Sequence, residues 1–149
     1  LSLELMEKAK ANNVEILLPI DAVVADEIKA GVDTEIVDID NIPADKEALD
    51  IGPKTAKLFA DKIKDAKTVV WNGPMGVFEI KEFSNGTNEV AEALADSNAT
   101  TIVGGGDSAL AIEMAGLKDK ITHVSTGGGA SLEFLEGKDL PGISAIENN

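Results

Sequence analysis

The spacing of hydrophobic and polar positions divides this chain into short apolar strands that alternate with amphipathic helices. Apolar positions three and four residues apart predict helices, and short apolar or β-branched runs predict strands. In chain order we expect a helix at 2–13, strands at 14–18 and 35–39, a helix at 53–64, a strand at 68–71, a helix at 85–97, a strand at 100–103, a helix at 109–115, a strand at 121–125 and a helix at 127–136. This alternation predicts an α/β fold, Rossmann-like, with three α/β/α layers around a mainly parallel sheet.

Two stretches of the first third carry a weaker pattern. Residues 21–29 hold an apolar pair, Val23 and Val24, followed by one expected helical turn before Gly31. Residues 41–52 surround Pro43 and are expected to form a loop or short turns, with Leu49 and Ile51 as apolar anchors.

The most informative stretch is residues 100–115, where a β-branched run is followed by three glycines and then by helix-forming sequence. A strand, a glycine turn and a helix N-terminus together present free backbone N–H groups at the positive end of a helix dipole, where a phosphate can bind. The same order recurs at residues 123–134. Two such turns predict a phosphate-handling site.

These turns are expected to meet. Ligands of parallel α/β sheets bind beyond the carboxyl ends of the strands. Asn72, residues 104–107 and residues 126–129 each follow an expected strand. We therefore expect three loops to converge on one edge of the sheet.

Each of these residues also has an ordinary structural explanation. Asp107 is either the N-cap of a helix or a carboxylate that faces a phosphate through a cation such as Mg²⁺. Ser108 is either helix filler or a hydroxyl donor, and the glycines of 126–129 form either a tight turn or a close approach to a ligand. Glu79 reads as a solvated charge and His123 as a structural residue of a strand.

Common nucleotide motifs are weak or absent. Gly104-x-Gly106-x-x-Ala109 matches a loose dinucleotide fingerprint, but the following strand ends at Thr126 and Gly127 without an acidic residue to hold a ribose. The sequence contains no Gly-x-x-x-x-Gly-Lys-Ser/Thr, which excludes a P-loop.

Composition narrows the function classes. The net charge is −14, and all 13 basic residues are Lys. Binding to nucleic acid or to an anionic membrane surface is therefore excluded as a main function. Without Arg, a bound phosphate must be held by backbone N–H groups, hydroxyls, Lys or a cation. The chain has no Cys and no apolar run of membrane-spanning length, and we expect a cytoplasmic protein.

Three stretches taken together resemble phosphoglycerate kinase: WNGPMGVFE at 71–79, GGGDS at 104–108 and TGGGASLE at 126–133. Leu18-Pro19-x-Asp21, Ala25-Asp26 and Leu49-Asp50-x-Gly52-Pro53 extend the resemblance over essentially the whole chain. It implies reversible phosphoryl transfer between 1,3-bisphosphoglycerate and MgADP, giving 3-phosphoglycerate and MgATP.

The resemblance also implies a domain organisation. Residues 1–149 correspond to a single partial domain, the later part of the C-terminal nucleotide-binding domain, and the chain begins Leu1-Ser2-Leu3 without an initiator Met. The N-terminal phosphoglycerate-binding domain is absent, and the sheet is expected to be incomplete. An apolar edge or face should then be exposed, prone to self-association or to binding the missing part, although family members are typically monomers.

The resemblance assigns site roles residue by residue. For the base and sugar of the nucleotide, the implied residues are Leu49, Met75 and Val77, with Glu79 on the ribose hydroxyls. For the phosphates, they are Asn72 with Gly73, and Gly105, Gly106 and Ser108 around the phosphate oxygens. Asp107 is implied to bind Mg²⁺. Gly127, Gly128 and Gly129 would present a helix N-terminus to the phosphoryl group during transfer.

Two departures from the family pattern bear on activity. The Gly-Gly-Ala-Lys stretch, whose Lys contacts nucleotide phosphate, is absent, and so is the Arg of the N-terminal domain. Because phosphoryl transfer depends on cationic stabilisation of spreading charge, we expect these 149 residues to be inactive alone. A non-catalytic nucleotide- or phosphate-binding module remains the alternative, and a purely structural fragment is the third reading.

Overall fold

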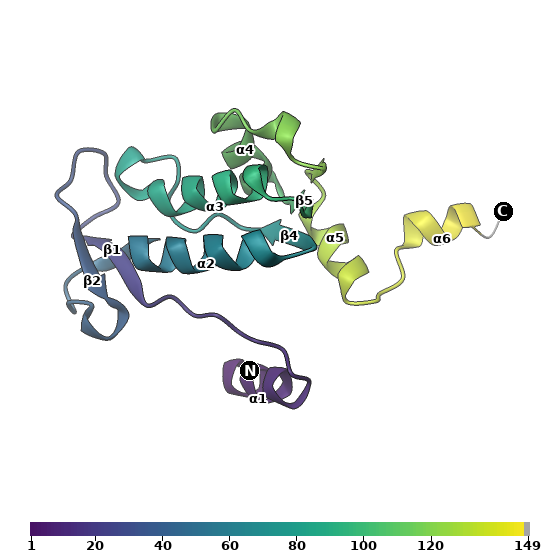
Figure 1. Cartoon of the computed structure of the whole chain (residues 1–149), viewed down its shortest axis with the longest axis horizontal. Helices are drawn as coiled ribbons and strands as arrows, with labels where there is room; N and C mark the ends of the chain where they lie inside the picture. Colours follow the sequence, from purple (N-terminus) through teal and green to yellow (C-terminus); the bar gives the residue numbers. More distant parts are fainter. Residues whose placement is uncertain (148–149) are drawn as a thin grey trace.

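The computed structural model describes residues 1–147 and contains two three-stranded sheets with helices around them (Figure 1). Its elements are α1 (Ser2–Ala11), β1 (Asp21–Ala25), β2 (Glu35–Asp38), β3 (Glu47–Ile51), α2 (Pro53–Asp65), β4 (Thr68–Asn72), α3 (Asn85–Asp96), β5 (Thr100–Gly104), α4 (Gly106–Met114), β6 (His123–Ser125), α5 (Gly128–Leu135) and α6 (Pro141–Glu147). In these residues no helix is both long and apolar enough to cross a bilayer.

The second half of the chain forms the expected parallel sheet, in the order β4–β5–β6. Trp71 of β4 lies beside Val103 of β5, and both are buried in the main core. Val90 and Leu94 of α3 and Ile112 of α4 pack against them. The α/β fold is confirmed, with a sheet that is small and incomplete.

The opposite face of this sheet is covered only in part. Successive strand residues point to opposite faces, so Val70 and Ile102 lie on the side away from Trp71 and Val103. Helix α5 packs here, and a groove of about 410 Å³ runs between it and the sheet, lined also by Phe134. The sequence predicted an exposed apolar edge or face without locating it, and this face of the sheet carries an apolar groove.

The first half of the chain forms an antiparallel sheet, in the order β2–β1–β3, that the sequence did not predict. Two predictions were wrong here. Residues 21–25 are a buried strand, β1, with no helical turn after it, and residues 47–51 are a strand, β3, within the expected loop. Both strands carry a buried aspartate, a residue depleted in strands, which obscured the strand pattern.

The expected strand at residues 14–18 was also wrong. Val14, Ile16 and Leu18 alternate as in a strand, but they are exposed and belong to no ladder among residues 1–147. The segment links α1, which has no buried residue, to β1, and Figure 1 shows α1 standing apart from the sheets. An alternating pattern becomes a strand only where a partner supplies the hydrogen bonds.

Buried aspartates join the antiparallel sheet to the two long helices. Asp21 of β1 accepts hydrogen bonds from the Thr55 N–H (2.8 Å), the Thr55 hydroxyl (2.6 Å) and the Lys54 N–H (3.0 Å) in the first turn of α2. Asp50 of β3 accepts one from the Gly86 N–H of α3 (2.8 Å). Neither helix has a side-chain cap from its own N-cap residue. The sheet therefore supplies the caps.

Candidate functional site

Three loops meet at the carboxyl ends of β4, β5 and β6. A Cβ added to Gly128 would lie 2.8 Å from the Cα of Gly105 and 3.5 Å from the side-chain nitrogen of Asn72. A Cβ added to Gly105 would lie 3.1 Å from the side-chain oxygen of Asn72. The three loops that the sequence predicted to converge are therefore in direct contact around these three residues.

Two glycines of this cluster have backbone conformations that favour glycine. Gly73 has φ +108° and Gly105 has φ +97°. The Gly73 N–H donates a 2.7 Å hydrogen bond to the Oγ of Ser108, which is buried at the start of α4. Ser108 thereby ties the loop after β4 to α4, and its own O–H remains available to donate.

Asp107 is not a helix cap. Helix α4 begins at Gly106 with Gly105 in the N-cap position, so Asp107 lies inside the first turn. Its carboxylate is exposed and makes no hydrogen bond or ion pair with any of residues 1–147. No heavy atom lies within 4 Å of the position of a Cβ on Gly106. A free carboxylate thus stands beside open backbone at a helix N-terminus.

This donor set suits Mg²⁺ bound together with phosphate. Residues 1–147 contain no group of three or more His, Asp or Glu side chains that could hold a metal ion alone. Mg²⁺ is usually bound by one or two carboxylates plus substrate phosphates and water. Asp107 can supply the carboxylate, and the first turn of α4 can supply N–H groups to the phosphate.

The glycines of residues 127–129, at the start of α5, have different surroundings. Gly128 is forced by its contact with Gly105, whereas a Cβ on Gly129 would meet nothing within 4 Å. Gly127 donates its N–H to the Ser125 Oγ (3.2 Å) and accepts from the Ser131 hydroxyl (2.9 Å). Position 129 is therefore open, whereas the close backbone contact is at Gly128, the first residue of α5.

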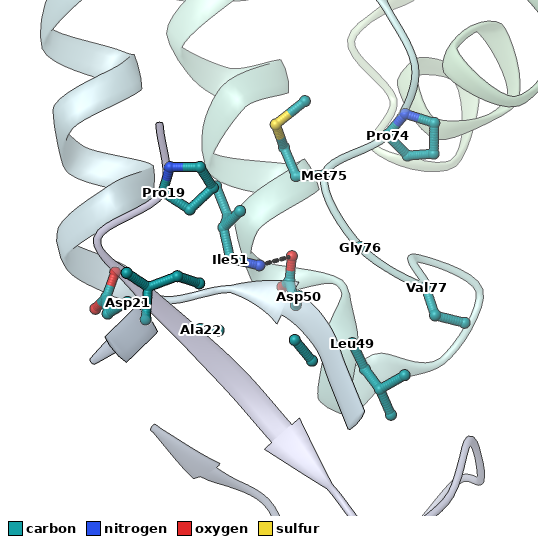
Figure 2. A pocket seen from close by; sticks show the side chains of 12 residues that line it. Pro19, Asp21, Ala22, Leu49, Asp50, Ile51, Pro74, Met75, Gly76 and Val77 are labelled. Carbon is teal, nitrogen blue, oxygen red and sulfur yellow. Dashed lines mark hydrogen bonds between the residues drawn. The ribbon is translucent and has the colours of Figure 1, made fainter. Parts of the chain in front are cut away.

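A pocket of about 370 Å³ lies between β3 and the loop that follows β4 (Figure 2). Its lining includes Leu49, Met75 and Val77, three of the residues predicted to lie along a nucleotide. The Val77 N–H donates to the Leu49 carbonyl (2.9 Å), and the Thr87 hydroxyl oxygen accepts from the Met75 N–H (3.0 Å). The loop is thus held from both β3 and α3.

Glu79 lies elsewhere. It is exposed and lines a second hollow, of about 250 Å³, with Phe78, Lys81 and Met114. Its neighbours Met75 and Val77 line the first pocket instead. The predicted site residues therefore form three groups, namely the phosphate loops, the pocket beside β3 and the hollow beside Glu79.

Sequence reasoning missed the two buried aspartates beside the first pocket. Burial opposes ionisation of Asp21, but hydrogen bonds from the Thr55 side chain and the Lys54 N–H outweigh it and lower the pKa of Asp21. Burial raises the pKa of Asp50 to about 6, against hydrogen bonds from Gly86 and Ile51. Asp50 stands in the Leu49-Asp50-x-Gly52-Pro53 motif, but no local pattern reveals that it lies against Gly76 and Gly86.

Fold and loops define an α/β protein whose glycine turns meet at the carboxyl end of a parallel sheet, the usual place for a phosphate-containing ligand. The family model of phosphoglycerate kinase matches residues 1–138. The chain belongs to the phosphoglycerate kinase family.

Individual relatives of this chain carry the same family name. Phosphoglycerate kinase of Thermosipho africanus is 61% identical over 152 aligned positions, which cover 99% of this chain and 38% of that protein. The enzyme of Clostridium botulinum strain Hall is 61% identical, with 99% and 37% covered. The structure of phosphoglycerate kinase from Coxiella burnetii superposes with a TM-score of 0.90 at 46% identity, covering 95% of this chain and 37% of that one. The chain thus spans less than two fifths of the length of these relatives.

Proposed function

We propose that this chain is part of a cytoplasmic enzyme of glycolysis and gluconeogenesis that transfers a phosphoryl group between 1,3-bisphosphoglycerate and ADP. The products are 3-phosphoglycerate and ATP, and this chain carries part of the Mg-nucleotide site. Family membership supports the reaction. The contact of Asn72, Gly105 and Gly128 supports the site, since it gathers three loops at the carboxyl end of the parallel sheet.

We assign the phosphate end of the nucleotide to the loops after β4 and β5. The amide of Asn72 can donate to a phosphate oxygen, and Gly106 brings a backbone N–H close to it. Gly105 gives its own N–H to the Ser125 carbonyl (3.0 Å), so its part is to let the backbone approach the phosphate. Ser108 fixes Gly73 and hence the direction of the loop that carries Asn72. Asp107 would hold Mg²⁺, which supplies neutralisation of phosphate charge when bound.

We assign the base and ribose to the segment 73–79 and to β3. Leu49, Met75 and Val77 offer apolar contact beside the first pocket, and Glu79 offers a carboxylate for ribose hydroxyls at the next hollow. The N-terminus of α5, with Gly127, Gly128 and Gly129, would face the phosphoryl group during transfer.

The chain alone should not catalyse transfer. It has a net charge of −14 and no Arg, so the described loops place only N–H groups, hydroxyls and one free carboxylate at the phosphate end. Stabilising the charge that spreads over a transferring phosphoryl group needs cations. We therefore assign binding to this part and catalysis to the full-length protein with its phosphoglycerate domain.

The test is calorimetric titration of MgADP into the chain, with Asp107→Ala and a matched Glu113→Gln variant. Glu113 is an exposed acid of the same helix, outside the loop cluster. We expect weak binding that requires Mg²⁺, that falls about tenfold or more in Asp107→Ala and that is unchanged in Glu113→Gln. Equal affinity of the wild type and Asp107→Ala would contradict the metal role of Asp107.

A further inference from the structure

We propose that Asp50 is a positioning residue for the nucleotide: it sets the place of the Met75–Val77 turn relative to α3. The inference rests on the proposed function, which assigns Met75 and Val77 to the nucleotide. Asp50 itself is assigned no contact with the nucleotide, the metal or the reacting groups. It acts through the turn that lies against it.

The first argument is the closeness of the turn to Asp50. The side chain of Asp50 is only 4% exposed. A Cβ on Gly76 would lie 2.4 Å from the Oδ1 of Asp50 and 2.6 Å from the carbonyl oxygen of Leu49. The Val77 N–H donates to that same carbonyl. The turn is thus pressed onto Asp50 at its centre and bonded to the preceding residue of β3. Figure 2 shows the segment that carries Gly76 and Val77 passing beside Asp50 and Leu49.

The second argument is the link from Asp50 to α3. Its Oδ2 accepts a 2.8 Å hydrogen bond from the Gly86 N–H, and a Cβ on Gly86 would lie 2.5 Å from its Oδ1. The next residue, Thr87, uses its hydroxyl oxygen to accept from the N–H groups of Met75 (3.0 Å) and Gly76 (3.3 Å). Asp50 therefore fixes the first turn of α3, and Thr87 of that helix holds the segment that contains Met75 and Gly76.

The third argument is that, among residues 1–147, only backbone N–H groups donate to the carboxylate of Asp50. Gly86 and Ile51 donate to it, whereas Glu89 of α3 adds a like charge, and Asp21 of β1 lines the same pocket. A carboxylate held in this way by two N–H groups has little freedom to move. A shorter side chain would leave the Gly86 N–H unpaired and a gap beneath Gly76.

The experiment compares Asp50→Ala and Asp50→Asn with the wild type in the full-length protein. Asp38→Asn serves as the control, because Asp38 is an exposed acid of the same sheet. Calorimetry gives the Kd for MgADP at a temperature where every variant is folded by circular dichroism. Amide hydrogen exchange of Met75, Gly76, Val77 and Gly86 is measured without nucleotide.

We expect a graded result. Asp50→Ala should raise the Kd about tenfold and Asp50→Asn about threefold, with faster exchange at the four amides and no change in Asp38→Asn. If Asp50→Ala does not fold, the Kd and the exchange rates of Asp50→Asn, compared with the wild type, test the inference. An unchanged Kd in a folded Asp50 variant overturns this inference. Failure of the wild type to bind MgADP overturns the proposed function instead, and the exchange rates still report whether Asp50 holds the turn.

Discussion

The Cα of Gly105 occupies the place that a side chain on Gly128 would need. A Cβ at Gly128 would lie 2.8 Å from that atom and 3.1 Å from the Gly105 nitrogen. Both partners are backbone, so neither can move aside without shifting a loop. Position 128 therefore couples the end of β6 to the start of α4.

Gly128→Ala should force the two loops apart. We expect the free energy of unfolding to fall by about 1–3 kcal/mol, the usual cost of overpacking. Gly129→Ala is the matched control, because a Cβ there meets nothing within 4 Å and the residue lies in α5. Its helix propensity should raise stability by up to ~1 kcal/mol. Urea unfolding of both variants tests the contrast, and equal effects would contradict the contact.

Asp21→Asn should destabilise the chain by about 3 kcal/mol, since it weakens the only cap of α2 and leaves buried N–H groups poorly paired. Asp38→Asn is the control, because Asp38 pairs with the same Lys54 on the surface and should matter little. Chemical denaturation measures the free energy of unfolding of both variants. A loss in Asp21→Asn no larger than in the control would show that the cap is unimportant.

The stabilisation by Asp21 should be lost in acid. The folded pKa is lowered, so the contribution is fully present above the unfolded value of 3.8 and disappears as the pH falls below it toward the folded pKa. As the pH is lowered from 6 to 2, the free energy of unfolding of the wild type should fall by this contribution, and that of Asp21→Asn should not.

Asp50 should have the opposite pH dependence. Its folded pKa is raised from 3.8 to about 6, so its relative stabilisation is complete below pH 3.8 and is lost as the pH rises through about 6. The rise of the pKa from 3.8 to about 6 corresponds to ~3 kcal/mol in the free energy of unfolding, which screening by water in the pocket lowers to about 2 kcal/mol. Between pH 4 and 7 the wild type should lose this much relative to Asp50→Asn. If the difference in stability between the wild type and Asp50→Asn stayed constant from pH 4 to 7, the raised pKa of Asp50 would be refuted.

Thr87→Val should free the loop after β4. Valine has the same shape but no acceptor, so the N–H groups of Met75 and Gly76 lose their partner, at a cost of about 1–2 kcal/mol. Their amide exchange should accelerate, while Thr87→Ser should keep both bonds. Nuclear magnetic resonance of the exchanging amides checks this. Slow exchange in Thr87→Val would mean that other contacts hold the loop.

The second half of the chain was predictable because its signals are local. Strands β4 and β5 are apolar or β-branched runs, β6 lies within the mixed segment 121–125, and helices α3, α4 and α5 carry clear periodicity or follow glycine turns. The parallel arrangement then brings the loop ends together, so the sequence alone predicts that Asn72, Gly105 and Gly128 lie at one edge of the sheet.

The first third was poorly predicted because its strands depend on distant partners. Strand β1 pairs with both β2 and β3, and its Asp21 is buried only because α2 offers N–H groups to it. Residues 14–18 have a strand pattern without a partner strand among residues 1–147. A local pattern reports which face is apolar, but pairing and burial are decided by other segments.

The sequence by itself determined the α/β class, the glycine turns that precede α4 and α5, and the set of residues suited to phosphate, because these follow from composition and short-range spacing. Only the tertiary structure decided which glycine is forced by a close contact, that Asp107 is free rather than a cap, and that Asp21 and Asp50 cap helices of a neighbouring layer. The glycine contact and the two aspartate caps depend on distances between segments more than 20 residues apart, such as Asp50 and Gly86. Distances of this kind arise only when the layers pack.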